Sequence, residues 1–197
     1  MMDTTGVQRP VMSRDIDDLQ LIDRILAGEQ NLYAQLVERY KNYAFTIAHR
    51  IVQVRPEAEE AAQDAFIKAY NNLARFNREA RFSTWLYRIV FNTAVSYRRK
   101  QKHVYQSIEN TIIEYDQNAD KMMEKKDKSR FLQMGLEKLN EADRVAITLF
   151  YLKEMSLEEI GKITGMMPNT VKVRIHRARL RLADEMKNIL RLEALSL

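Results

Sequence analysis

The stretch NTVKVRIHRARLRL, residues 169–182, carries five basic residues and no acidic one. Four apolar residues recur through it at the three- and four-residue steps of a helix and form one stripe: Val171, Ile175, Ala178 and Leu182. At about 100° per residue, the opposite face carries Val173, His176, Arg177 and Leu180. The pattern predicts a helix that docks through its stripe, while its positive face is either a plain solvated surface or a surface for a polyanion.

The residues just before this stretch favour the second alternative. Ser156 with Glu159 is typical of a capping box at the start of a short helix, Gly165 of a tight turn, and Pro168 of the first turn of the next helix. A capped helix, a tight turn and a second helix in this order are typical of a DNA-binding helix-turn-helix. Ile160 and Ile163 would receive the apolar stripe. We therefore expect early residues of the second helix to reach base edges and later arginines to reach phosphates.

The composition indicates a helix-rich protein and permits an anionic partner. Of 197 residues, 46% are hydrophobic and 30% charged, with only five Gly and three Pro, and the formal net charge is +5. There is no Cys, which excludes disulfides and is compatible with a reducing compartment. No apolar run approaches the ~20 residues of a membrane-spanning helix, so we expect a cytoplasmic protein with no membrane insertion of its own.

Apolar residues recur at helical steps almost throughout, which predicts an all-α fold of two small helical domains joined by a flexible linker. The expected parts are a tail (1–15), a first domain (16–102), an acidic linker (103–127), a second domain (128–190) and a C-terminal tail (191–197). Helix ends are predicted from Gly28, Pro56, Ser83 as an N-cap, and Asn140 as another. Residues 75–102 hold eight Lys or Arg against one acid, whereas 103–120 hold four acids and no Lys or Arg.

Two longer stretches resemble a known family. AEEAAQDAFIKAYNNLARFNREARFSTWLYRIVFNTAVSYRRK (58–100) and LEEIGKITGMMPNTVKVRIHRARLRL (157–182) are similar to the extracytoplasmic-function sigma factors, compact two-domain members of the sigma-70 family. The resemblance covers the chain from about residue 19 to residue 190. It implies binding to the beta and beta-prime subunits of core RNA polymerase and initiation at two-part promoters. The −10 element would be melted, and the helix-turn-helix would read the −35 element.

The resemblance also implies roles for individual residues. Core polymerase binding falls on Gln63, Asp64 and Phe66. Capture of a flipped −10 base falls on Phe76, the loop 77–82 and Asn92, with the nearby backbone held by Arg88, Arg98, Arg99 and Lys100. Reading of the −35 element falls on Asn169, Thr170, Lys172, Val173, Arg174, His176 and Arg177. Val173 stands where the family usually has a small polar residue, and His176 where an aromatic often occurs.

Several alternatives stay open from the residues alone. A ring and an amide suit a flipped base, yet Phe76 also fits a core position at the end of a helix. Trp85 lies on a buried stripe and is assigned to the core. Phe91 lies on the other face, where it fits a DNA or partner surface or packs against the first helix. His176 contacts either a base or a phosphate. The acidic stretch 107–120 is either a tether or, following the family, a polyanion mimic in a positive channel of the polymerase.

The sequence argues against an enzyme. The three His have no metal-ligand spacing, and no Gly-rich phosphate loop is present, so we expect neither a catalytic site nor a metal or cofactor. Promoter DNA and core RNA polymerase are the expected partners, and the family adds an anti-sigma factor. Two other classes remain as alternatives. One is a dimeric repressor or activator that binds operator DNA alone, and the other is a protein-interaction adaptor, which leaves both basic faces unexplained.

Overall fold

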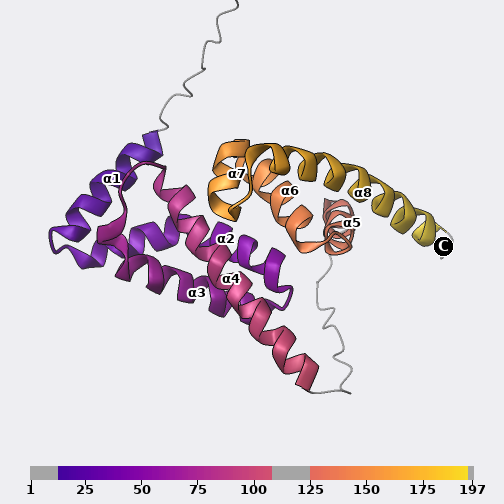
Figure 1. The fold of residues 1–197 in the computed structure, drawn as a ribbon, viewed down its shortest axis with the longest axis horizontal. Coiled ribbons are helices and arrows are strands. Elements are labelled where there is room, and N and C mark those ends of the chain that lie inside the picture. Colours follow the sequence, from indigo (N-terminus) through magenta and orange to yellow (C-terminus); the bar gives the residue numbers. More distant parts are fainter. Residues whose placement is uncertain (1–12, 108–124, 195–197) are drawn as a thin grey trace, which may run out of the picture.

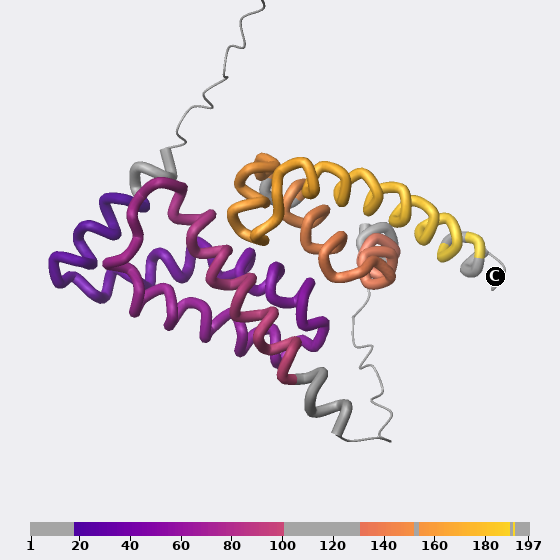
Figure 2. Tube along the Cα trace, viewed as in Figure 1, coloured from indigo at the N-terminus to yellow at the C-terminus, as the bar shows by residue number. Residues whose placement is uncertain are grey.

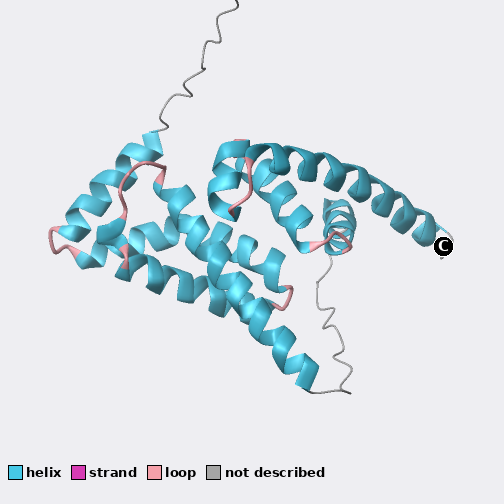
Figure 3. Ribbon diagram, in the orientation of Figure 1, coloured by secondary structure: helices cyan, strands magenta, loops and turns pink. Residues whose placement is uncertain are grey.

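The structure is a computed structural model that describes residues 13–107 and 125–194, and every regular element in these ranges is a helix (Figures 1 and 3). In chain order they are α1 (Ser13–Leu26), η1 (Gln30–Leu32), α2 (Tyr33–Val52), α3 (Arg55–Asn71), η2 (Leu73–Arg75), α4 (Phe82–Ser107), α5 (Lys125–Glu137), α6 (Glu141–Lys153), α7 (Leu157–Thr164) and α8 (Pro168–Ala194). The expected all-α fold is confirmed. The linker acids Glu109, Glu114, Asp116 and Asp120 lie outside the described residues.

Helices α1 to α4 form the first packed unit, in which α2, α3 and α4 each contact the other two. Alanines on the inner face of α3 are almost fully buried and let its neighbours approach closely: Ala58, Ala61, Ala62, Ala65 and Ala69. Helix α1 is attached by a buried polar contact, because the Asp18 carboxylate accepts hydrogen bonds from Tyr40 and Arg39 of α2. Gly28 follows α1 with a φ of 115°, which ends that helix where the sequence predicted.

Helices α5 to α8 form the second packed unit, and its helix caps are the ones that the sequence predicted. Asn140 caps α6 by accepting from the Asp143 backbone N–H at 3.0 Å. Ser156 and Glu159 form the expected capping box of α7, and Gly165 ends that helix with a φ of 76°. Gly135 of α5 lies against α8, where an added Cβ would stand 2.8 Å from Leu182 Cδ1. A glycine there permits α5 and α8 to pack closely.

The two units dock against each other, which the sequence did not predict. Figures 1 and 2 show α7 lying along α4 and α6 beside α2, and both pairs are in contact. Arg144 Nε of α6 donates to the Arg50 carbonyl of α2 at 2.6 Å, and the Arg50 guanidinium donates to the Gln133 side chain of α5. Arg81 Nη1 also lies 3.8 Å from Glu159 Oε1 of α7. Buried residues of α6 and α7 thereby join the core of the first unit.

Three helix ends and one side chain differ from the sequence-based expectations. Helix α4 begins at Phe82, so Ser83 is a helical residue and not the N-cap. The helix then continues to Ser107, since the polar residues after 98 include neither Gly nor Pro and the loss of apolar periodicity does not stop a helix. Helix α8 continues to Ala194 for the same reason. Phe91 is half-buried and packs against the common core, not on an open surface.

Candidate nucleic-acid interface

Helices α7 and α8 form a helix-turn-helix whose second helix is docked through its apolar stripe. Val171 and Ala178 are 0% exposed and Ile175 is 6% exposed, while Leu182 is half-buried against the second core cluster. Ile160 and Ile163 of α7 are buried on the receiving side. The stripe therefore fixes which face of α8 points outward, as the sequence predicted.

The outward face of α8 presents side chains that can reach a groove of DNA. Val173 is 47% exposed and Leu180 is 57% exposed. Asn169 and Thr170 are exposed in the first turn, where backbone N–H groups are free to donate. The exposed residues of the following turns are Lys172, His176, Arg177, Arg179 and Arg181. Six of the seven predicted −35 residues thus lie exposed on one helix.

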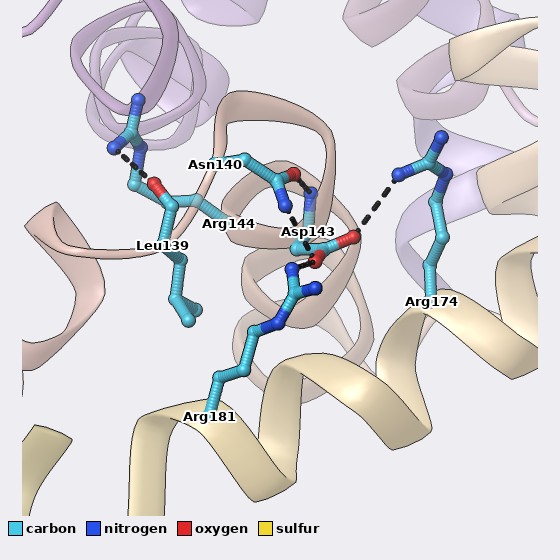
Figure 4. Close-up of polar contacts among 6 residues, drawn as sticks. All are labelled: Leu139, Asn140, Asp143, Arg144, Arg174 and Arg181. Atoms are coloured by element: carbon cyan, nitrogen blue, oxygen red, sulfur yellow. Dashed lines mark hydrogen bonds and ion pairs between the residues drawn. The ribbon is translucent and has the colours of Figure 1, made fainter. Parts of the chain in front are cut away.

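The seventh, Arg174, is half-buried and held by a residue that sequence reasoning missed. Arg174 Nη1 donates to Asp143 Oδ1 at 3.1 Å, and Arg181 Nη1 donates to Asp143 Oδ2 at 2.8 Å (Figure 4). The Asp143 side chain is only 3% exposed. A groove of about 440 Å³ opens between the start of α6 and α8 at this point, lined on the α8 side by Asn169, Thr170, Val173, Arg174, Arg177 and Arg181. From sequence, Asp143 carries only the general signal of an acid in the first turn of a helix.

A second hollow of about 440 Å³ lies between α3 and α4 in the first unit. Asn92, one of the predicted −10 residues, lines it together with residues that the sequence did not single out for DNA: Lys68, Asn72, Arg75, Trp85, Ile89, Thr93 and Ser96. Lys68 Nζ donates to Thr93 Oγ1 at 3.3 Å and so places a cation at the hollow. The hollow combines an indole ring, an amide and basic side chains, which is the set that holds an unstacked base.

Two aromatic residues beside this hollow differ in burial from the roles expected for them. Phe76 is 7% exposed, as its core alternative predicted, and its ring centroid lies 5.7 Å from that of Phe82 and 5.4 Å from that of Trp85. Trp85, assigned to the core, is only half-buried and lines the hollow. The short 3-10 helix η2 and the loop after it turn Phe76 inward. The exposed aromatic surface at this site is therefore that of Trp85.

The basic residues of α4 predicted to hold the DNA backbone are all exposed: Arg88, Arg98, Arg99 and Lys100. Arg98 Nη1 lies 3.4 Å from the Val52 carbonyl, on the side of α4 that faces Arg144 of the second unit. Lys100 Nζ lies 5.8 Å from the ring centroid of Tyr97. The docked second unit thus adjoins part of the basic surface of α4.

The residues predicted to bind core polymerase lie together on α3 with different accessibility. Gln63 is exposed, and Asp64 is half-buried. Asp64 Oδ2 accepts from Tyr97 Oη at 2.6 Å, and this hydrogen bond raises the pKa of the Tyr97 hydroxyl. Phe66 is 8% exposed, so its ring lies in the core and its carbonyl accepts from Tyr33 Oη at 2.8 Å. Of these three side chains, Gln63 is therefore presented outward, Asp64 is presented in part, and Phe66 is not.

The described residues offer little for other chemistry. Within residues 13–107 and 125–194, no helix is long and apolar enough to cross a membrane. In the same part of the chain, no cluster of His, Asp or Glu has the arrangement of a metal site.

Comparison with known proteins identifies the family. The Sigma-70 region 2 model matches residues 36–104, and the Sigma-70 region 4 model matches residues 132–182. The ECF RNA polymerase sigma factor SigW of Bacillus subtilis (strain 168) is 32% identical over 179 residues, which cover 85% of this chain and 96% of the relative. The ECF RNA polymerase sigma-E factor of Escherichia coli (strain K12) is 32% identical over 191 residues, covering 91% and 100%.

Solved structures with this fold include a sigma factor from Bartonella quintana and the protein CnrH. RpoE from Bartonella quintana, in complex with the anti-sigma factor NepR, gives a TM-score of 0.64 at 25% identity over 79% of this chain and 96% of that one. CnrH, in complex with the cytosolic domain of CnrY, gives a TM-score of 0.62 at 23% identity over 85% of this chain and 96% of that one. This match shows a likeness of fold. Taken with the region 2 and region 4 matches, these relatives place the chain in the extracytoplasmic-function sigma factors of the sigma-70 family.

Proposed function

We propose that this chain reads the −35 element with the outward face of α8 and engages the −10 element at the hollow between α3 and α4. As an extracytoplasmic-function sigma factor it binds core RNA polymerase and DNA and directs promoter-specific initiation, while catalysis belongs to the polymerase. The observation that carries the proposal is the outward face of α8. A helix docked by a buried stripe and exposed on a basic face fits a DNA groove.

For the −35 element, we assign base contacts to the first turns of α8. Lys172 and Arg177 donate to guanine, Asn169 and Thr170 donate or accept at base edges or phosphates, and Val173 offers an apolar contact to a thymine methyl group. We also assign Arg174 and His176, which lie on the same helix, to contacts with the −35 element. The proposal is supported by the exposure of six of the seven residues along consecutive turns.

For the −10 element, we assign the unstacked base to the hollow beside Asn92. The indole of Trp85 offers a stacking surface, and the Asn92 amide offers donor and acceptor groups to a base edge. The buried Phe76 ring packs against the Trp85 ring and holds it in place. Four basic residues of α4 then bind the backbone of the opened strand: Arg88, Arg98, Arg99 and Lys100.

For the polymerase, we assign the contact to the outer face of α3. Gln63 and the Asp64 carboxylate meet the polymerase, Tyr97 holds that carboxylate in place, and Phe66 anchors this part of α3 in the core. We further propose two domains, 16–102 and 128–190, joined through residues 103–127, of which the first five belong to α4 and the last three to α5. We also propose a cytoplasmic location. An anti-sigma factor is proposed as the regulator, supported by the likeness to RpoE of Bartonella quintana, a sigma factor solved in complex with the anti-sigma factor NepR.

Run-off transcription with purified core RNA polymerase tests the proposal. Core enzyme is mixed with this chain and a library of duplexes carrying random bases, and the transcribed templates are sequenced. We expect two enriched motifs at the −35 and −10 spacing, with weak sequence-specific binding by the chain alone. Transcription that is equally good without the chain would sink the proposal. Tight operator binding by the chain alone would instead favour a self-sufficient repressor or activator.

A further inference from the structure

The outward face of α8 is not a uniform row of mobile cations. Arg174 and Arg181 are two turns apart on the same side of the helix, and both guanidinium groups reach one carboxylate, that of Asp143 on α6 (Figure 4). Arg174 and Arg181 side chains remain 37% and 57% exposed, whereas Asp143 is 3% exposed. The acid therefore lies beneath two arginines whose outer edges still face solvent.

Asp143 is itself fixed by the start of α6. Its backbone N–H donates to the Asn140 side-chain oxygen at 3.0 Å, and Asn140 Nδ2 donates back to Asp143 Oδ2 at 2.8 Å. Both carboxylate oxygens thus have partners, one from Arg174 and the other from Arg181 and Asn140. A carboxylate held at a helix N-terminus with two charge-assisted partners has little freedom to turn away. The arginine heads are correspondingly held against α6.

We propose that Asp143 is a specificity-determining residue for the −35 element, acting as a positioning residue through Arg174 and Arg181. The inference rests on the proposed reading of DNA by α8. Non-specific affinity for DNA comes from cations that neutralise phosphates wherever they meet them. One carboxylate between two arginines halves their net charge and restricts both side chains to one arrangement. Asp143 thereby lowers binding to arbitrary duplex while leaving base contacts by Lys172 and Arg177 unaffected.

Arg177 supports this division of roles. It lies between Arg174 and Arg181 in sequence and lines the same groove, yet no ion pair holds it within the described part of the chain. Three arginines of one groove are therefore treated differently by the fold. Two are restrained by an acid from the neighbouring helix, and the one assigned to a base is left unrestrained.

The test compares Asp143→Asn with Asp184→Asn in the full chain. Both changes remove one negative charge, but Asp184 is exposed on α8, where its carboxylate lies 3.9 Å from Lys187 Nζ. The Asn140 cap uses the backbone N–H of residue 143 and so survives the first change. Binding to a mixed-sequence duplex is measured between 50 and 200 mM salt. Between 50 and 200 mM salt, the fold-loss of affinity should be larger for Asp143→Asn than for the wild type. Each arginine that is freed should increase this loss about threefold, which is the effect of about one additional phosphate contact. Asp184→Asn should show little change.

The same variants are then tested in holoenzyme by the random-template selection. Asp143→Asn should weaken the selected −35 motif and leave the −10 motif unchanged, and the double variant Asp143→Asn with Arg181→Gln should restore the −35 motif. A merely structural role would lower the melting temperature and would not be rescued by removal of an arginine. Equal salt dependence and equal −35 motifs in the two single variants would overturn the inference. Failure of the wild-type holoenzyme to select any −35 motif would instead overturn the proposed function.

Discussion

Replacing Arg144 by methionine should weaken both the second unit and its docking onto the first. The Arg144 guanidinium donates to the Arg50 carbonyl at 2.6 Å, to the Glu137 carbonyl at 3.2 Å and to the Leu139 carbonyl at 3.1 Å. Burial, with some contribution from Arg50 and Arg98, lowers the pKa of Arg144, so the charged group is held at a desolvation cost. Each charge-assisted bond contributes ~1.5–3 kcal/mol, and the desolvation cost of several kcal/mol offsets part of the sum.

The net loss on Arg144→Met should be about 2–4 kcal/mol of unfolding free energy, since the three carbonyls lose their donor while the aliphatic volume is retained. At an m-value of ~2 kcal/mol/M, the urea midpoint of the second unit should fall by about 1–2 M. Trp85, the single tryptophan, lies on α4, so its fluorescence follows the first unit, whereas circular dichroism follows the helices of both. We expect coincident transitions in the wild type and separated transitions in the variant.

Arg191→Met is the matched control, because Arg191 is exposed near the end of α8. It should change the unfolding free energy by no more than ~0.5 kcal/mol. The argument fails if Arg144→Met also changes the free energy by less than this amount. It fails equally if the two probes of the variant still report one transition, because Arg144 would then not couple the units.

Three further predictions follow from other residues. Burial, with Arg50 next in effect, lowers the pKa of His49 below its ordinary 6.5. Because the unfolded chain then binds more protons, the free energy of unfolding should fall as the pH drops below about 6.5. The variant His49→Gln should flatten this fall in urea titrations from about pH 7.5 to 5.5. Lys172→Ala or Arg177→Ala should each cost ~1–3 kcal/mol, roughly 5- to 150-fold, in use of the −35 element, whereas Asn92→Ala should reduce open complexes probed by permanganate with −35 binding nearly intact. Loss of the same step in both classes would contradict the assignment. Amide replacement of Glu109, Glu114, Asp116 and Asp120 should change the ratio of abortive to full-length RNA if the linker mimics a polyanion, and an unchanged ratio would favour the tether.

Local signals in the sequence predicted most of the helices and the outward face of α8. The Asn140 cap, the Ser156–Glu159 capping box and the left-handed Gly165 are each decided within a few residues, so they are readable without knowledge of the fold. The apolar stripe of α8 is equally local, because helical periodicity alone determines which residues share a face. The orientation of the residues proposed to read DNA could therefore be predicted.

Contacts between distant residues were not predictable in this way. Asp143 and Arg181 are far apart in sequence, and nothing in either neighbourhood indicates that the acid neutralises that arginine. The inward turn of Phe76 depends on packing against Phe82 and Trp85, which only the fold brings together. The half-burial of Phe91 comes from its packing against a core to which several helices contribute. Each miss concerns a side chain whose environment is supplied by another helix.

The docked arrangement also bears on how one chain contacts both promoter elements. In a straight duplex, elements about 25 base pairs apart are separated by roughly 85 Å, at 3.4 Å per base pair. Helix α8 packs on α7 and α7 packs on α4, so at 8–10 Å per packed pair the axes of α8 and α4 lie about 20 Å apart. The two helices have 26 and 27 residues and rise about 1.5 Å per residue. When half the length of each helix is added to the distance between their axes, Asn92 and Arg177 lie within about 60 Å of each other. On the proposed assignment of Arg177 to the −35 element and Asn92 to the −10 element, the docked units do not reach both elements together. We therefore expect the contact between Arg144 of α6 and the Arg50 carbonyl of α2 to be released when a full promoter is bound.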